Sequence, residues 1–398
     1  MKYNPLALKD QLTAELTHNI LPFWMNRMKD NLHGGFYGQI RGNGQLVPGA
    51  DKGGILNARI LWTFSSAYLT FKNPDYLATA ASARDYIFTH FFDPDFQGTF
   101  WSVDYLGNPQ DAKKQIYSQA FFIYALAEYY QATSDTQSLD AAKALFMLIE
   151  KYSFDPVSNG YFEACSRDWK PLEDMRLSNK DANEKKTMNT HLHILEAYTN
   201  LYRIWKDDRL AAQLRNLVKI FHDKINKKKS WHLNLFFDEN WTCKSAVTSY
   251  GHDIESSWLL YEAALELNDD ALLARVKTIS LNIADASMQG LQKDGSLMYE
   301  KNNLTGHCDF ERHWWPQAEA VVGFYNAYEL TGDLKYLHTA MNNFGYIQQN
   351  LVDKMNGEWF WSIMPDGSEN KEDDKAGFWK CPYHNGRMCL ELIKRIAG

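Results

Sequence analysis

A histidine and a glutamate stand three residues apart at the expected start of a helix. His252 and Glu255 follow the helix breaker Gly251, and Asp253 suits a helix cap or a first turn. Side chains at this spacing can project from one side of a helix. A carboxylate beside an imidazole fixes the tautomer of the ring and raises its basicity, as proton transfer requires. On its own this spacing favours an ordinary helix start, so the interpretation depends on the other stretches.

Side chains of the same reactive kind stand at the expected starts of five further helices. They are Arg59, Tyr117, Asn189, His193, Trp315, Glu319, Trp379 and His384. A buried arginine needs a carboxylate partner or an oxygen-rich ligand, and for Arg59 we favour the ligand. Tyr117 fits an aromatic core equally well. His193 lies in phase with Asn189, so it is a better candidate than His191 to face a shared cavity.

The tryptophans and amides each have a structural alternative. Trp314 and Trp315 project in different directions, so one is expected in the core and the other against a ligand. Glu319 falls four residues after Trp315 and therefore on the same helix face. Asn189 could be a buried amide or a cap, and Trp379 could be a lid or simple packing.

Three histidines on three helices suit the removal of a proton next to a carbonyl group. Histidine titrates near neutral pH and is a natural base for this step. The resulting enediolate is negative at oxygen, and Arg59 or His193 could stabilise it. Inversion of that carbon needs a second acid on the opposite face, so His252 and His384 are expected to face each other. No cofactor is required, because the aldehyde of an open-chain sugar already acidifies the C2 proton.

The elements that would position these residues repeat along the chain. Short glycine-aromatic stretches recur with a period of roughly sixty residues and indicate hairpins or extended loops. Pairs of amphipathic helices are expected between them, at residues 6–28, 54–71, 75–91, 114–133, 135–153, 187–206, 208–227, 252–267, 270–289, 315–331, 333–352 and 382–397. Six helix pairs predict an all-α (α/α)6 barrel over residues 1–398, a single domain. The inner helices should begin at one mouth of the barrel, where a concave site would form.

Composition narrows the class of protein. The net charge is −7, which argues against nucleic acid or an anionic membrane as the main partner. No apolar run is long enough for a membrane span, and the N-terminal residues lack the apolar core of a signal peptide. Five scattered cysteines favour a reducing cytoplasm. Patterns such as CxxC, HExxH, GxGxxG and the Walker motif are absent from the sequence, so neither a metal nor a nucleotide cofactor is expected.

Four motifs together resemble one family. They are Lys186-Thr187-Met188-Asn189, Tyr250-Gly251-His252-Asp253-Ile254-Glu255, Trp314-Trp315-Pro316-Gln317-Ala318-Glu319-Ala320 and Trp379-Lys380-Cys381-Pro382-Tyr383-His384-Asn385-Gly386-Arg387. They look like the N-acylglucosamine 2-epimerase superfamily and, within it, most resemble the bacterial cellobiose 2-epimerases. The resemblance runs over essentially the whole chain. It implies an (α/α)6 barrel that epimerises the reducing-end glucose of cellobiose, lactose and related β-1,4 disaccharides to mannose.

The resemblance also implies roles for residues. His252 and His384 would be the two acid/bases, with Glu255 supporting His252. The reducing sugar would lie among His193, Arg59, Tyr117 and Asn189, with Glu319 among the binding residues and Trp315 and Trp379 as stacking platforms. The protein would act on a small-molecule substrate as a monomer.

Three other functions are considered. The nearest is N-acylglucosamine 2-epimerase or a mannose–fructose isomerase of the same superfamily, which would form the same enediolate. A glycoside hydrolase on the same barrel would need two carboxylates, for which Glu255 and Glu319 are the best pair. A non-catalytic sugar-binding module would explain the tryptophans but not three histidines.

Overall fold

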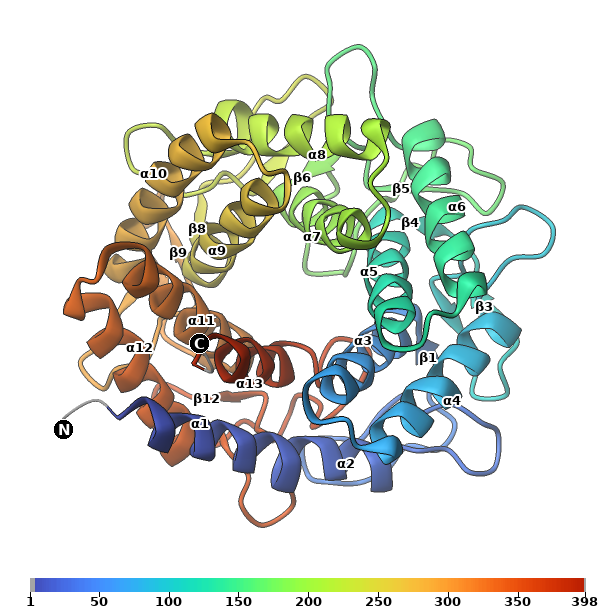
Figure 1. The fold of residues 1–398 in the computed structure, drawn as a ribbon, viewed down its shortest axis with the longest axis horizontal. Helices are drawn as coiled ribbons and strands as arrows, with labels where there is room; N and C mark the ends of the chain where they lie inside the picture. The colour runs from blue at the N-terminus through green and yellow to red at the C-terminus, as the bar shows by residue number, and fades with distance from the viewer. Residues whose placement is uncertain (1–3, 397–398) are drawn as a thin grey trace.

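The computed structural model describes residues 4–396. Residues 1–3 and the expected end of the last helix at residue 397 lie outside the described residues. The described chain is mostly helical, and helices surround a common centre in two layers (Figure 1). The inner layer consists of α3 (Gly54–Phe71), α5 (Ile116–Thr133), α7 (Met188–Ile204), α9 (Tyr250–Glu266), α11 (Trp314–Thr331) and α13 (His384–Arg395). Each inner helix contacts the next, and α13 also contacts α3, which closes the ring.

The outer layer is formed by the other helices. They are α1 (Pro5–Ala14), α2 (Leu21–Asn26), α4 (Pro74–His90), α6 (Thr136–Tyr152), α8 (Asp208–Ile220), α10 (Asp270–Ser287) and α12 (Leu334–Tyr346). A π-helical segment, Glu15–Ile20, joins α1 to α2, and π-helical turns extend α8 through Ile225 and α12 through Leu351. Within residues 4–396, none of the helices combines the length and the hydropathy that a membrane span requires.

Burial explains why a helix joins one layer or the other. In α3 every residue from Gly54 to Ala67 is buried, because neighbouring helices cover it on all sides. In α4 the buried residues recur every three or four positions, among them Tyr76, Ala80, Ala83 and Ile87. This single apolar stripe is typical of a helix that packs on one side and faces solvent on the other.

Small antiparallel sheets hold the starts of the inner helices at one end of the ring. The strand before an inner helix pairs with a strand from the next interval along the chain. The pairs are β1 (Lys52–Gly53) with β2 (Ser102–Val103), β4 (Lys114–Gln115) with β5 (Ala164–Cys165), β6 (Lys186–Thr187) with β7 (Phe236–Phe237), β8 (Val247–Ser249) with β9 (Glu300–Asn302), and β11 (Arg312–His313) with β12 (Ser362–Ile363). β2 also pairs with β3 (Pro109–Asp111), and β9 with β10 (Cys308–Asp309). A bridge between Ile40 and Ala376 completes the circle.

Buried lysine–aspartate pairs fix the same end. Each aspartate accepts backbone hydrogen bonds from its own loop and an ion pair from a lysine just before an inner helix. The pairs are Asp30–Lys52 at 2.9 Å, Asp93–Lys114 at 2.9 Å and Asp155–Lys186 at 2.7 Å. The lysine side chains are fully buried, so each pair is shielded from solvent and fixes the loop against the helix start.

Two details of the repeat differ from the expectation. The last inner helix begins at His384, not at Pro382, because the carbonyl of Pro382 is turned toward α3 and accepts a hydrogen bond from Thr63 at 3.1 Å. The fourth interval has no glycine at its turn. Trp231 takes the left-handed conformation there, with φ 64°, just before Leu233 bridges to Asn226.

Candidate active site

Two histidines from different helices contact one tryptophan at the strand end of the ring. His252 lies in the first turn of α9, Trp315 is the second residue of α11, and His384 is the first residue of α13. The ring centroid of Trp315 is 4.6 Å from that of His252 and 5.7 Å from that of His384. Both predicted acid/base residues therefore lie against the same indole.

Glu319 fixes the ring of His384. Nδ1 of His384 lies 2.7 Å from Oε1 of Glu319, and Oε2 of Glu319 accepts a hydrogen bond from Nε1 of Trp258 at 3.1 Å. In the neutral imidazole the proton then belongs on Nδ1, and Nε2 keeps its lone pair. The sequence grouped Glu319 with substrate-binding residues, but the structure places it beside His384 because α11 packs against α13.

His252 has a different partner from the expected one. Its Nδ1 lies 2.9 Å from Oγ of Ser249, the residue before α9. The expected support from Glu255 is wrong, because Oε1 of Glu255 lies 2.6 Å from Nη2 of Arg387 and 3.9 Å from Nδ1 of His384. Three residues advance a helix by about 300°, so the two side chains diverge by about 60° and reach different neighbours.

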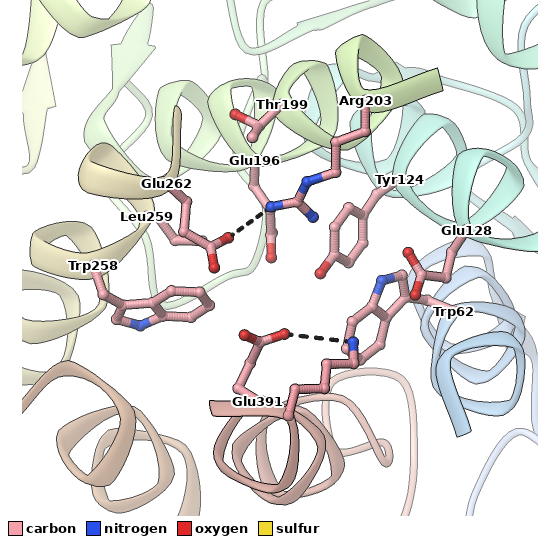
Figure 2. Close-up of a pocket in the computed structure, with 11 residues that line it drawn as sticks. Trp62, Tyr124, Glu128, Glu196, Thr199, Arg203, Trp258, Leu259, Glu262 and Glu391 are labelled. Atoms are coloured by element: carbon pink, nitrogen blue, oxygen red, sulfur yellow. Dashed lines mark hydrogen bonds and ion pairs between the residues drawn. The ribbon is translucent and has the colours of Figure 1, made fainter. Parts of the chain in front are cut away.

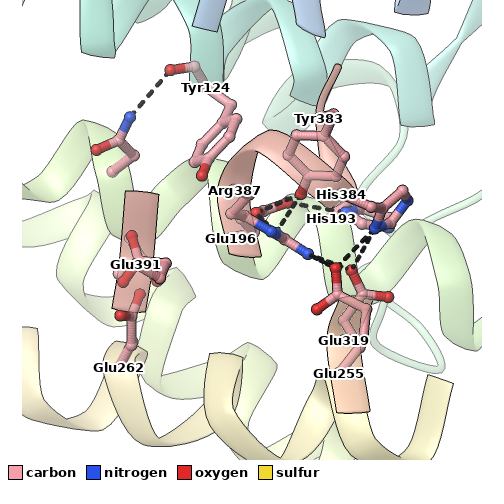
Figure 3. Close-up of polar contacts among 12 residues, drawn as sticks. Tyr124, His193, Glu196, Glu255, Glu262, Glu319, Tyr383, His384, Arg387 and Glu391 are labelled. Carbon is pink, nitrogen blue, oxygen red and sulfur yellow. Dashed lines mark hydrogen bonds and ion pairs between the residues drawn. The ribbon is translucent and has the colours of Figure 1, made fainter. Parts of the chain in front are cut away.

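Arg387 ties three buried carboxylates together (Figure 3). Nη2 lies 2.6 Å from oxygens of Glu255 and of Glu319, and Nη1 pairs with Glu196. The guanidinium is fully buried and also lies over the rings of Trp258 and Tyr383. A planar cation with several donors suits this role, because it can bind several carboxylates at once.

His193 is held by a carboxylate one turn along α7. Its Nδ1 lies 2.9 Å from Oε2 of Glu196, and the ring meets Tyr117 edge-on with centroids 4.9 Å apart. His193 is therefore oriented as His384 is, by an ionic partner on Nδ1. Asn189, four residues earlier, has a buried Oδ1 for which none of residues 4–396 provides a hydrogen bond.

Arg59 is a buried cation that contacts no carboxylate within residues 4–396. Its Nη2 donates to the hydroxyl of Tyr117 at 2.8 Å, and Nη1 donates to the carbonyl of Trp379 at 3.4 Å. The guanidinium lies over the rings of Phe121 and Tyr383, 4.2 Å and 4.6 Å from their centroids. An arginine with only neutral partners is suited to an oxygen-rich or anionic ligand.

Burial keeps the histidines neutral. Burial is the main cause that lowers the pKa of His252 to about 3. Burial likewise lowers the pKa of His384 and of His193. Neutral rings at pH 7 can accept a proton, so each of them is available as a base.

The cluster formed by Glu255, Glu319 and His384 has the spacing of a metal site. Their ligand atoms lie within 4.8 Å of one another. Arg387 donates to both carboxylates, so its guanidinium already provides the positive charge that a metal ion would bring to this cluster. The same contacts disfavour a glycoside hydrolase. The two carboxyl groups of a hydrolase lie about 5 Å or more apart on the two sides of the glycosidic bond, whereas a single nitrogen of Arg387 holds Glu255 and Glu319 together.

A small cavity lies among charged residues of the inner helices (Figure 2). Its volume is about 20 Å³, room for a water molecule but not for a sugar ring. Arg203 pairs there with Glu262, and Glu196 contributes to the wall. Glu196 therefore lines this cavity and also contacts His193.

Sequence reasoning missed the residues that organise the site. Glu196, Arg387, Ser249 and Trp258 were not assigned a role, although Arg387 ends one quoted motif and Ser249 directly precedes another. The spacing of His193 and Glu196 equals that of His252 and Glu255 and could have pointed to Glu196. No pattern within one stretch could have joined Arg387 to carboxylates on three other helices.

Comparison with known proteins identifies the family of this chain. The family model described as N-acylglucosamine 2-epimerase (GlcNAc 2-epimerase) matches residues 35–385. The chain belongs to the N-acylglucosamine 2-epimerase family. A relative within this family, the cellobiose 2-epimerase of Bacteroides fragilis, is 54% identical over 386 residues, which are 97% of this chain and 98% of that one.

Solved structures of the family superpose on the whole chain. The cellobiose 2-epimerase of Bacillus thermoamylovorans B4167 matches with a TM-score of 0.94 and 42% identity, covering 98% of this chain and 100% of that one. A D-mannose isomerase matches with a TM-score of 0.84 at 19% identity, covering 99% and 100% of the two chains, which shows a shared fold. The family resemblance expected from the four motifs is confirmed.

Proposed function

We propose that this protein is a cellobiose 2-epimerase with a single (α/α)6-barrel catalytic domain. It converts the reducing-end glucose of β-1,4-linked disaccharides to mannose, turning cellobiose into glucosyl-mannose and lactose into epilactose. The observation that carries the chemistry is the contact of Trp315 with both His252 and His384. The choice of sugar rests on full-length relatives that are named cellobiose 2-epimerases.

The reaction begins with opening of the sugar ring and ends with inversion at C2. One of the two neutral imidazoles, His252 or His384, takes the C2 proton through its Nε2 atom. Glu319 supports the imidazolium that forms on His384, since it lies 2.7 Å from Nδ1. The first imidazolium then releases its proton to solvent, and the other imidazole takes up a proton and delivers it to the opposite face of the cis-enediolate, so that both rings end neutral.

Arg59 stabilises the charge that develops between the two histidines, and His193 would do so once it takes up a proton, because Glu196 would then hold the imidazolium at Nδ1. Arg59 lacks a carboxylate partner within the described part of the chain, so its charge is free for the enediolate oxygens. Tyr117 and Asn189 hold the hydroxyl groups of the reducing sugar, and Trp315 and Trp379 stack on the faces of the sugar rings. Activity requires neither a metal nor a cofactor, because the carbonyl group of the open-chain sugar acidifies C2.

The expected setting is a monomer in the cytoplasm. All five cysteines are free, which suits a reducing compartment, and the net charge of −7 keeps the protein away from anionic partners.

Parallel assays on cellobiose, lactose, mannose and N-acetylglucosamine test the substrate. We expect epilactose from lactose and no N-acetylmannosamine from N-acetylglucosamine. Turnover of only N-acetylglucosamine would assign the protein to the N-acylglucosamine 2-epimerases, and turnover of only mannose to the aldose–ketose isomerases.

A further inference from the structure

Three carboxylates and one guanidinium share a buried space beside His384. Glu196, Glu255 and Glu319 are each 1–4% exposed, and Arg387 is not exposed at all. Arg387 contacts all three carboxylates, and two of them meet at its Nη2 atom. If all three were ionised, the cluster would carry three negative charges against one positive charge in a region almost closed to solvent. Burial makes such an excess costly, and the usual outcome is that one carboxylate takes up a proton.

The hydrogen bonds show which carboxylates are ionised. Glu319 accepts bonds from three donors, on His384, Trp258 and Arg387, and therefore acts purely as an acceptor. Glu196 contacts His193, Tyr383 and Arg387. Its pKa falls to about 2 although burial opposes this, because the charge of Arg387 and the hydrogen bonds from His193 and Tyr383 together outweigh burial. Glu255 accepts only from Arg387, and its Oε2 atom has no hydrogen bond among the described residues. Glu255 is therefore the group with room for a proton.

We propose that Glu255 carries a proton in the resting enzyme while Glu319 stays ionised, and that loss of this proton limits the reaction at alkaline pH. Glu255 is a positioning residue in this proposal, since it acts on the reaction through Arg387 and His384. The charged and titratable groups that face it are Glu319 on α11, Arg387, His384 and Tyr383 on α13, Glu196 on α7 and Tyr117 on α5. Burial, followed by the charge of Glu319, also raises the pKa of Glu255.

The proton matters because it balances the charge of the site. With Glu255 neutral, the cations Arg59 and Arg387 equal the anions Glu196 and Glu319 in number. Proton transfer from C2 to a histidine then creates an imidazolium and an enediolate in a site of zero net charge. Once Glu255 ionises, the enediolate forms beside an additional buried anion, and the rate falls. The second half of this proposal rests on the proposed epimerase activity, whereas the protonation itself does not.

Infrared difference spectroscopy of the folded protein tests the protonation without any assay of activity. We expect the C=O band of a protonated carboxylic acid at neutral pH, titrating away at alkaline pH, and we expect Glu255→Gln to remove it. Glu163→Gln is the matched control, because burial also raises the pKa of Glu163 to about 8 while this side chain contacts Thr187 and Thr190 outside the cluster. If Glu255→Gln leaves every carboxylic acid band in place, the proposal is wrong, even if the protein proves to be an epimerase.

The pH dependence of kcat/KM tests the kinetic half. We expect the wild type and Glu163→Gln to share an alkaline decline, and Glu255→Gln to remain active without that decline, because its amide cannot ionise. An unchanged alkaline decline in Glu255→Gln would overturn the link to the rate. If the wild type turns over no sugar, the proposed function fails. The infrared result still decides whether Glu255 carries a proton.

Discussion

Replacement of Glu319 by glutamine should slow proton transfer strongly while the fold persists. The carboxylate accepts hydrogen bonds from Nδ1 of His384, Nη2 of Arg387 and Nε1 of Trp258. A glutamine of the same size has one oxygen, and its NH₂ group would face one of these donors. The imidazolium that forms on His384 would also lose its anionic partner.

The magnitude follows from these two losses. A hydrogen bond to a charged group contributes about 1.5–3 kcal/mol, and an unsatisfied buried donor costs about 1–3 kcal/mol. Each 1.4 kcal/mol corresponds to a factor of about ten in rate. Since only part of the second cost differs between the ground state and the transition state, we expect kcat to fall about 100- to 1,000-fold.

Steady-state kinetics on cellobiose measure this effect. KM should change little, because Glu319 is 1% exposed and its oxygens are taken up by His384, Arg387 and Trp258. Glu262→Gln is the control, since Glu262 pairs with Arg203 and Arg395 away from His384 and should leave kcat within about threefold. A fall in kcat of less than about threefold in Glu319→Gln, with the fold intact, would refute the supporting role of this carboxylate.

Two predictions concern stability. Lys52→Met should lower the free energy of unfolding by about 3–5 kcal/mol, because it leaves Asp30 buried without its lysine. Lys170→Met, at an exposed pair, should change the free energy of unfolding little. Equal losses in chemical denaturation would contradict the role of the buried pair. Burial lowers the pKa of His252 to about 3, whereas an unfolded histidine titrates near 6.5, so the unfolded state binds more protons between these values. The contribution of His252 to the free energy of unfolding should therefore be fully present above about pH 6.5. It should fall as the pH drops toward 3, by up to about 1.4 kcal/mol per pH unit. His252→Asn should flatten this pH dependence in thermal unfolding below about pH 6.5 and leave the pH dependence above about pH 7 as it is in the wild type. An unaltered slope below about pH 6.5 would show that His252 does not contribute.

Local patterns predicted the framework well. The expected bounds of α3, 54–71, match Gly54–Phe71, and the other inner helices begin within about two residues of their expected starts. This succeeded because the glycine-aromatic turns and the helix caps are encoded within short stretches. Those starts also bring Arg59, Tyr117, His193 and Trp315 to the same end of the ring, as the repeat predicted.

Partners across helices were not predictable in the same way. His193 and His252 each precede a glutamate by three residues, yet only His193 binds its own glutamate. Arg387 contacts both glutamates, but the second oxygen of Glu196 reaches His193, whereas His252 turns to Ser249. Which carboxylate meets which cation depends on the packing of four helices, and no single stretch of sequence contains that information.

Hydrogen exchange at C2 in deuterated water tests the central claim most directly. The wild type should form the epimer with deuterium at C2. His252→Asn and His384→Asn should each fail to invert the carbon, yet each should exchange the C2 hydrogen of one epimer only, and the two variants should choose opposite epimers, since one base remains on each face. Inversion at a near-normal rate in either variant, or exchange of the same epimer by both, would contradict a mechanism with two facing imidazoles.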